Sequence, residues 1–212
     1  MNAKIYTEET YIDERLKSLG LDRARLLDVV SIGQLASLNC SPNHPPMIAG
    51  LWGWGETVRA LREYLLPEGW EVSDQHNYAL TTSPHGRMAI AVCAGDEGTG
   101  NPDASPSNKA PKGPSTVLAV TVNQAQMSLP FEDAPVPPPS VVNDCTTWIL
   151  LVHRNQDEFR AELSIPLSIK DDGRIDGWRE RIMLGSVPLD DELLEIDSPS
   201  TPDISIDVKR RA

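Results

Sequence analysis

The sequence predicts an α+β fold in which N-terminal helices pack on an antiparallel β-sheet. Apolar residues recur every three to four positions up to about residue 70, as in amphipathic helices. Beyond residue 77 the apolar residues form short alternating or continuous runs between turn residues, which is typical of strands. Helices followed by strands indicate one α+β domain over residues 1–189, with a helical part at 1–70 and a sheet at 77–185.

The helical part is expected to contain three helices. Apolar residues line one face of residues 8–38, and Gly20 is a natural end for the first helix. Asp22 is expected to cap the second helix, because its carboxylate can accept from the free amides of the first turn. A third helix is predicted over residues 53–66, before Pro67.

The sheet is expected to contain six strands. Pro84-His85-Gly86 has the turn chemistry of a β-hairpin between the first two. Segments rich in glycine and proline at 95–115 and 124–143 predict long exposed loops. The strands are predicted over residues 78–83, 87–94, 116–122, 148–153, 159–165 and 178–184, those at 87–94 and 116–122 being buried. A short helix is the alternative for residues 178–184.

The formal net charge is −12, which argues against binding nucleic acid by general charge attraction. Seven carboxylates and no lysine or arginine lie between Asp190 and Asp207. This composition predicts a disordered acidic tail at 190–212, or alternatively a mimic of nucleic acid that inhibits a host DNA-binding or defence protein. The sequence contains neither a membrane-spanning run nor a secretory signal, so a cytoplasmic location is expected.

Evidence for an enzyme is limited to one group of residues. The glycines of the 95–115 segment fit neither a phosphate-binding loop nor a dinucleotide fingerprint, and we expect no cofactor. Cys40, Cys93 and Cys145 are too far apart for a paired zinc site, so no metal is expected there. The remaining enzyme hypothesis is a divalent-metal site that uses Asp96 and Glu97, with Lys109 and Lys112 nearby.

Aromatic residues give little further indication of function. Trp52, Trp54 and Trp70 bracket the third predicted helix and are expected to pack in the core or to dock that helix. A platform for stacking bases would need more surrounding lysine and arginine.

The most specific string is Gln126-Met127-Ser128-Leu129-Pro130-Phe131. It resembles the longer form of the linear motif by which bacterial replication and repair proteins dock on the DNA polymerase sliding clamp, with Phe131 where leucine is commoner. Residues 95–116, the following apolar run and this motif also resemble uncharacterised proteins of proteobacterial phages and integrative elements. These resemblances imply a protein of a mobile element whose partner is the sliding clamp and which affects replication or repair. The lack of a catalytic motif favours a non-enzymatic role.

The residue types of the motif suit docking of an extended peptide. Leu129 and Phe131 are bulky anchors worth about 1.5–3 kcal/mol each when buried. Met127 can fill an irregular pocket, Gln126 offers a donor and an acceptor, and Pro130 lowers the cost of ordering. The alternative is that the two anchors fold back on the sheet of their own chain.

Overall fold

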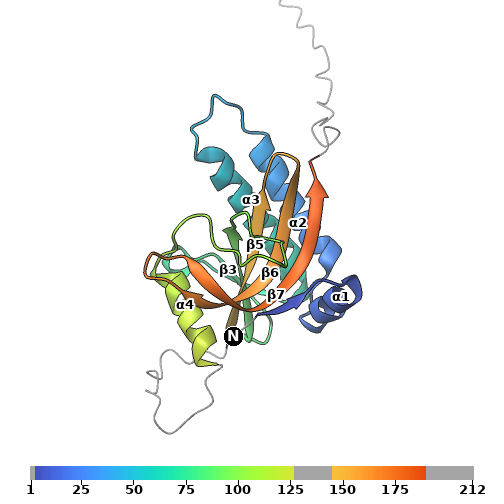
Figure 1. Ribbon diagram of the computed structural model, residues 1–212, viewed down its shortest axis with the longest axis vertical. Helices are drawn as coiled ribbons and strands as arrows, with labels where there is room; N and C mark the ends of the chain where they lie inside the picture. The colour runs from blue at the N-terminus through green and yellow to red at the C-terminus, as the bar shows by residue number, and fades with distance from the viewer. Residues whose placement is uncertain (1–2, 127–144, 190–212) are drawn as a thin grey trace, which may run out of the picture.

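Three helices form in the first third of the chain because its apolar residues share one face at helical spacing. The computed structural model describes residues 3–126 and 145–189 and places these helices as α1 (Glu9–Ser18), α2 (Arg23–Leu38) and α3 (Ile48–Leu65) (Figure 1). The Asp22 carboxylate accepts a hydrogen bond of 2.9 Å from the Arg25 amide, which confirms the predicted cap of α2. α3 begins at Ile48, earlier than predicted, so it also contains Gly50, which the prediction placed outside the helix.

The strands join into a sheet whose order is β1-β7-β6-β5-β4-β3-β2. A predicted hairpin is confirmed, since β3 and β4 pair antiparallel across the turn at residues 83–87. The strands are β1 (Lys4–Tyr6), β2 (Glu71–Ser73), β3 (Leu80–Thr82), β4 (Met88–Ala94), β5 (Thr146–Arg154), β6 (Glu158–Ile169) and β7 (Ile175–Pro188), with single 3-10 turns η1 (Leu66–Glu68) and η2 (Gln75–Asn77) before and after β2.

The fold is α+β as predicted, but the sheet is mixed rather than antiparallel. β1 pairs with β7 in parallel, and β4 pairs with β5 in parallel along residues 88–94 and 146–152. The other neighbours are antiparallel. Parallel neighbours cannot be joined by a tight turn, so the chain between β4 and β5 must cross over the sheet.

The prediction of a strand at residues 116–122 is wrong, because this segment belongs to α4 (Pro114–Ala125), which lies within the crossover. One face of α4 is buried through Thr116, Val120 and Asn123, whereas Val117 and Leu118 are 40% and 54% exposed. The side-chain amide of Asn123 donates to the carbonyl oxygens of Thr147 and Pro166 at 2.9 and 3.1 Å, which ties the helix to β5 and β6.

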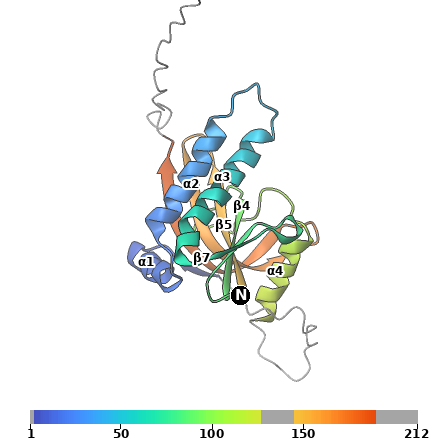
Figure 2. The same cartoon turned by 180° about the vertical axis from the view of Figure 1, so that it is seen from behind.

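The sheet is covered on both faces. α1, α2 and α3 lie on one side, where they share a large apolar core with the sheet (Figure 2). α4 and the loop 95–113 lie on the other side, over a smaller cluster that includes Cys93, Ile149 and Trp178 (Figure 1). Within the described residues, no helix combines the length and apolar character needed to cross a membrane.

The loop 95–113 is fixed on the sheet by a buried ion pair. Arg181 and Glu162, with side chains 2% and 0% exposed, pair at 2.6 Å. The Arg181 guanidinium also donates to the carbonyl oxygens of Ala104 and Asn101 at 2.6 and 3.1 Å, and Glu162 accepts from the Gly100 amide at 2.8 Å. These contacts attach the middle of the loop to β6 and β7, although its composition alone suggested an exposed segment.

Candidate functional site

The predicted docking motif begins where α4 ends. Gln126 is exposed and follows the last helical residue, Ala125. Its side-chain oxygen accepts a hydrogen bond of 2.7 Å from the Thr146 hydroxyl, so the end of α4 meets the start of β5. Met127 to Phe131 lie outside the described residues, as does the predicted acidic tail at 190–212.

The four residues of the metal-enzyme hypothesis are not brought together. Asp96 accepts from the Gly98 amide at 3.1 Å and so closes a local turn, while the Glu97 carbonyl accepts from Arg160. Lys109 and Lys112 line two cavities to which neither acidic residue contributes. In the part of the chain that the structure describes, no group of three or more His, Cys, Asp or Glu residues could hold a metal ion.

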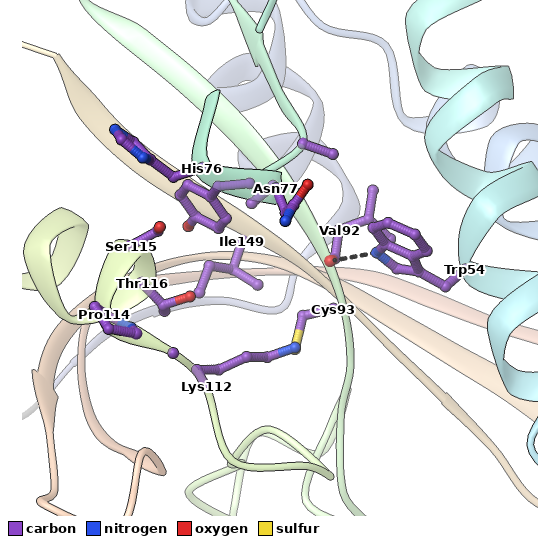
Figure 3. Close-up of a pocket in the computed structure, with 14 residues that line it drawn as sticks. Trp54, His76, Asn77, Val92, Cys93, Lys112, Pro114, Ser115, Thr116 and Ile149 are labelled. Carbon is purple, nitrogen blue, oxygen red and sulfur yellow. Dashed lines mark hydrogen bonds between the residues drawn. The ribbon is translucent and has the colours of Figure 1, made fainter. Parts of the chain in front are cut away.

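The larger of these two cavities lies at the carboxyl end of β4, beside the start of α4. The parallel strands β4 and β5 and the crossover helix α4 form a βαβ unit, and ligands of α/β sheets bind outside the carboxyl ends of such strands. The cavity has a volume of about 260 Å³. Figure 3 shows its walls, which come from α3, η2, β4, β5 and the first turn of α4.

Cys93 and Lys112 meet on one side of this cavity. The Lys112 side chain extends towards the Cys93 sulfur (Figure 3). Burial raises the pKa of the Cys93 thiol, and the Lys112 ammonium only partly opposes that rise. The thiol also donates to the Ala94 carbonyl at 3.3 Å. Cys93 is therefore kept as a neutral thiol, which is the wrong state for a nucleophile.

Trp54 also lines the cavity, next to Val92 of β4. β3 pairs with β4 only as far as Ile90, and the next available carbonyl, that of Val92, accepts a hydrogen bond of 3.1 Å from the Trp54 indole (Figure 3). This contact fixes the ring although Trp54 is 40% exposed. Trp70 is buried as predicted, but Trp52, at 52% exposure, also lies largely outside the core.

Tyr78 lines the same cavity and follows two residues in an unusual conformation. His76 and Asn77 have positive φ angles of 56° and 57°, a region that non-glycine residues rarely adopt. The Tyr78 hydroxyl oxygen is buried and makes no hydrogen bond within the described residues. Burial raises the pKa of Tyr78 to about 12, against a smaller opposing effect of the nearby Thr116 hydroxyl, whose geometry falls short of a hydrogen bond.

A second cavity of about 110 Å³ adjoins the first and shares Trp54, Val92 and Cys93 with it. Lys109 and Arg154 line this second cavity, and His153 places its Nδ1 atom 3.3 Å from the Gly95 carbonyl. Sequence reasoning identified Lys109 and Lys112 only as neighbours of Asp96. The Gly113-Pro114 pair at the end of the loop 95–113 was the local signal for a helix start here, because proline favours the first helical position.

Comparisons with protein-family models, with curated proteins and with solved structures find no match to this chain.

Replacing Tyr78 with phenylalanine should make the protein more stable than the wild type at high pH, in the window between about pH 10 and about pH 12. Because the folded pKa of about 12 exceeds the unfolded value of about 10, the native state retains a proton that the unfolded state loses. The wild type should lose about 1.4 kcal/mol of unfolding free energy per pH unit in this window, a loss that Tyr78→Phe avoids. Below this window the unfolding free energy of the variant should equal that of the wild type or exceed it by up to about 1 kcal/mol, since an unsatisfied hydroxyl is removed.

Denaturant unfolding of both proteins across that window measures the difference. Tyr11→Phe is the matched control, because the Tyr11 ring is 57% exposed. If the unfolding free energies of the wild type and Tyr78→Phe fell in parallel as the pH rises, the raised pKa of Tyr78 would be contradicted.

Proposed function

We propose that this protein is a non-enzymatic interaction protein that docks on the bacterial DNA polymerase sliding clamp through Gln126–Phe131. The observation that supports this proposal is the position of the motif. Its first residue, Gln126, is exposed at the point where the chain leaves α4, between two elements that are fixed on the sheet. A linear motif must leave a folded domain at such a position to reach a pocket on another protein. Docking would recruit an activity to the replication machinery or block access to the clamp.

Each residue type then has a distinct part in binding. Leu129 and Phe131 would be buried in the partner's pocket, and their burial would supply most of the affinity. Gln126 would fix the register through its amide. In the free protein the Gln126 oxygen already accepts from Thr146, so we expect this residue to add only about 1 kcal/mol to the binding free energy.

Calorimetric titration against purified clamp tests the proposal. We expect wild-type binding in the micromolar range or tighter. Leu129→Ala/Phe131→Ala should weaken it by at least about a hundredfold, since two anchors of roughly 1.5–3 kcal/mol each are removed. Gln126→Ala should weaken binding about fivefold, as expected for one neutral hydrogen bond. Gln156→Ala, at an exposed glutamine in the β5–β6 turn, is the matched control and should bind like wild type.

The unfolding free energy of the double variant distinguishes docking from packing within the chain. A groove of about 540 Å³, lined in part by Leu118, Val122 and Cys145, lies beside α4 and would suit anchors that fold back on the sheet. In that alternative Leu129→Ala/Phe131→Ala would lower stability by several kcal/mol. Unchanged stability with lost clamp binding supports the proposal, and equal binding by wild type and double variant rejects it.

A further inference from the structure

Positive side chains surround the two adjoining cavities, although the protein as a whole has a net charge of −12. Lys112 lines the larger cavity, and Lys109 and Arg154 line the smaller one. The described residues that line either cavity include no aspartate or glutamate. None of the three cations forms an ion pair within the described residues, whereas six other arginines do. Unpaired cations that face a cavity favour an anionic ligand.

The first turn of α4 adds backbone donors to this positive region. Gly113 is the N-cap residue and has no side chain that could cap the helix, and the first turn contains no acidic residue. The Thr116 amide bonds the Gly113 carbonyl at 3.1 Å, but the Ser115 amide has no hydrogen-bond partner within the described residues. An uncapped helix start carries partial positive charge, so it acts in the same direction as the Lys112 ammonium.

The backbone of both lysines is fixed. The Lys112 amide donates to the Gly173 carbonyl at 2.9 Å, and the Lys109 amide donates to the Ala94 carbonyl at 2.8 Å. Next to Lys109 in the chain, the buried Asn108 side chain donates to the Gly173 carbonyl at 2.9 Å and accepts from the Ile175 amide at 2.8 Å. The backbone positions from which both lysine side chains extend are therefore fixed before any ligand arrives, which lowers the cost of binding.

The walls of the cavities provide contacts for the uncharged part of a ligand. Trp54 lines both cavities and is fixed by its bond to the Val92 carbonyl. The Tyr78 hydroxyl lacks a hydrogen-bond partner within the described residues. We propose that the two cavities form one binding site for a small organic phosphate, with the phosphate group held by Lys112 and the first turn of α4 and the organic part against Trp54. This site is separate from the docking motif.

Titration with adenosine monophosphate, with adenosine and with inorganic phosphate tests the proposed site. We expect the nucleotide to bind and adenosine to show no binding, because the phosphate carries the charge that the cations select. Inorganic phosphate should displace the nucleotide. Lys112→Met should weaken nucleotide binding about tenfold or more, as expected for the loss of one charge-assisted contact. Lys170→Met, at an exposed lysine in the β6–β7 turn, should leave the affinity unchanged.

A second variant separates loss of the site from loss of folding. Ser115→Asp introduces a carboxylate into the first turn of α4 and into the lining of the larger cavity. It should raise the melting temperature, because negative charge stabilises a helix start, while nucleotide binding falls below detection. The proposal is overturned if adenosine binds as tightly as the nucleotide, if Lys112→Met or Ser115→Asp binds like wild type, or if no nucleotide binds at concentrations up to about 1 mM.

Discussion

Replacing Arg181 with methionine is expected to lower the free energy of unfolding by about 3–5 kcal/mol, because the change leaves a buried carboxylate without its partner. Glu162 is fully buried, and Arg181 donates to it through two nitrogen atoms at 3.0 and 2.6 Å. The same guanidinium holds the carbonyl oxygens of Ala104 and Asn101. Arg181→Met therefore leaves an unpaired charge beneath the loop 95–113 and removes a donor from each carbonyl, although the Asn101 carbonyl still accepts from the Ala104 amide at 3.3 Å.

Urea unfolding of three variants measures this contribution. Arg59→Met is the matched control, because Arg59 forms ion pairs only on the exposed surface of α3, where screening makes them weak. Arg181→Met/Glu162→Leu should recover part of the loss, since it removes both charges, although the Gly100 amide then lacks its acceptor. A loss for Arg181→Met no larger than that for Arg59→Met would show that the pair does not hold the loop.

The burial of this pair explains one limit of the sequence prediction. In β6, apolar residues alternate with polar ones, a pattern that favours a strand with one face in water. The strand is confirmed, but its polar residues Glu162 and Ser164 are 0% exposed. The loop 95–113 covers these residues, although its low content of apolar residues predicted an exposed segment. The loop makes this contact through backbone groups bonded to Arg181 and Glu162, and such contacts leave no periodic pattern in a sequence.

Local signals predicted α1, α2, α3 and most strands, whereas the crossover helix α4 required knowledge of the neighbouring strands. The run Thr116–Val122 is apolar and rich in β-branched residues, which favours a strand. Because β4 and β5 pair in parallel, the chain must cross the sheet, and this requirement overrides the local preference. The cavity residues Trp54, Tyr78 and Lys112 are brought together by the same crossover, so their proximity could not be predicted from spacing along the chain.

Gly33→Ala is expected to destabilise the protein by about 2 kcal/mol or more, because α2 and α3 pack too closely at this position for a methyl group. A Cβ atom at Gly33 would lie 1.9 Å from the Thr57 hydroxyl oxygen and 2.6 Å from the Gly53 carbonyl oxygen. The second of these is a backbone atom, so a side-chain rotation cannot relieve the overlap and the two helices must separate. This cost exceeds the gain of about 1 kcal/mol that alanine usually brings to a helix.

Gly55→Ala in α3 is the matched control and should stabilise the protein by about 0.5–1 kcal/mol, because a Cβ atom there has nothing within 4 Å. The denaturant concentration at the unfolding midpoint should therefore fall for Gly33→Ala and rise for Gly55→Ala, although the chemical change is the same at both helical glycines. Separation of the helices also moves Trp54 relative to the Val92 carbonyl, so Gly33→Ala should weaken binding at the proposed phosphate site while Gly55→Ala leaves it unchanged. If both variants gained stability, α2 and α3 would not pack as closely at Gly33 as the distances to Thr57 and Gly53 indicate.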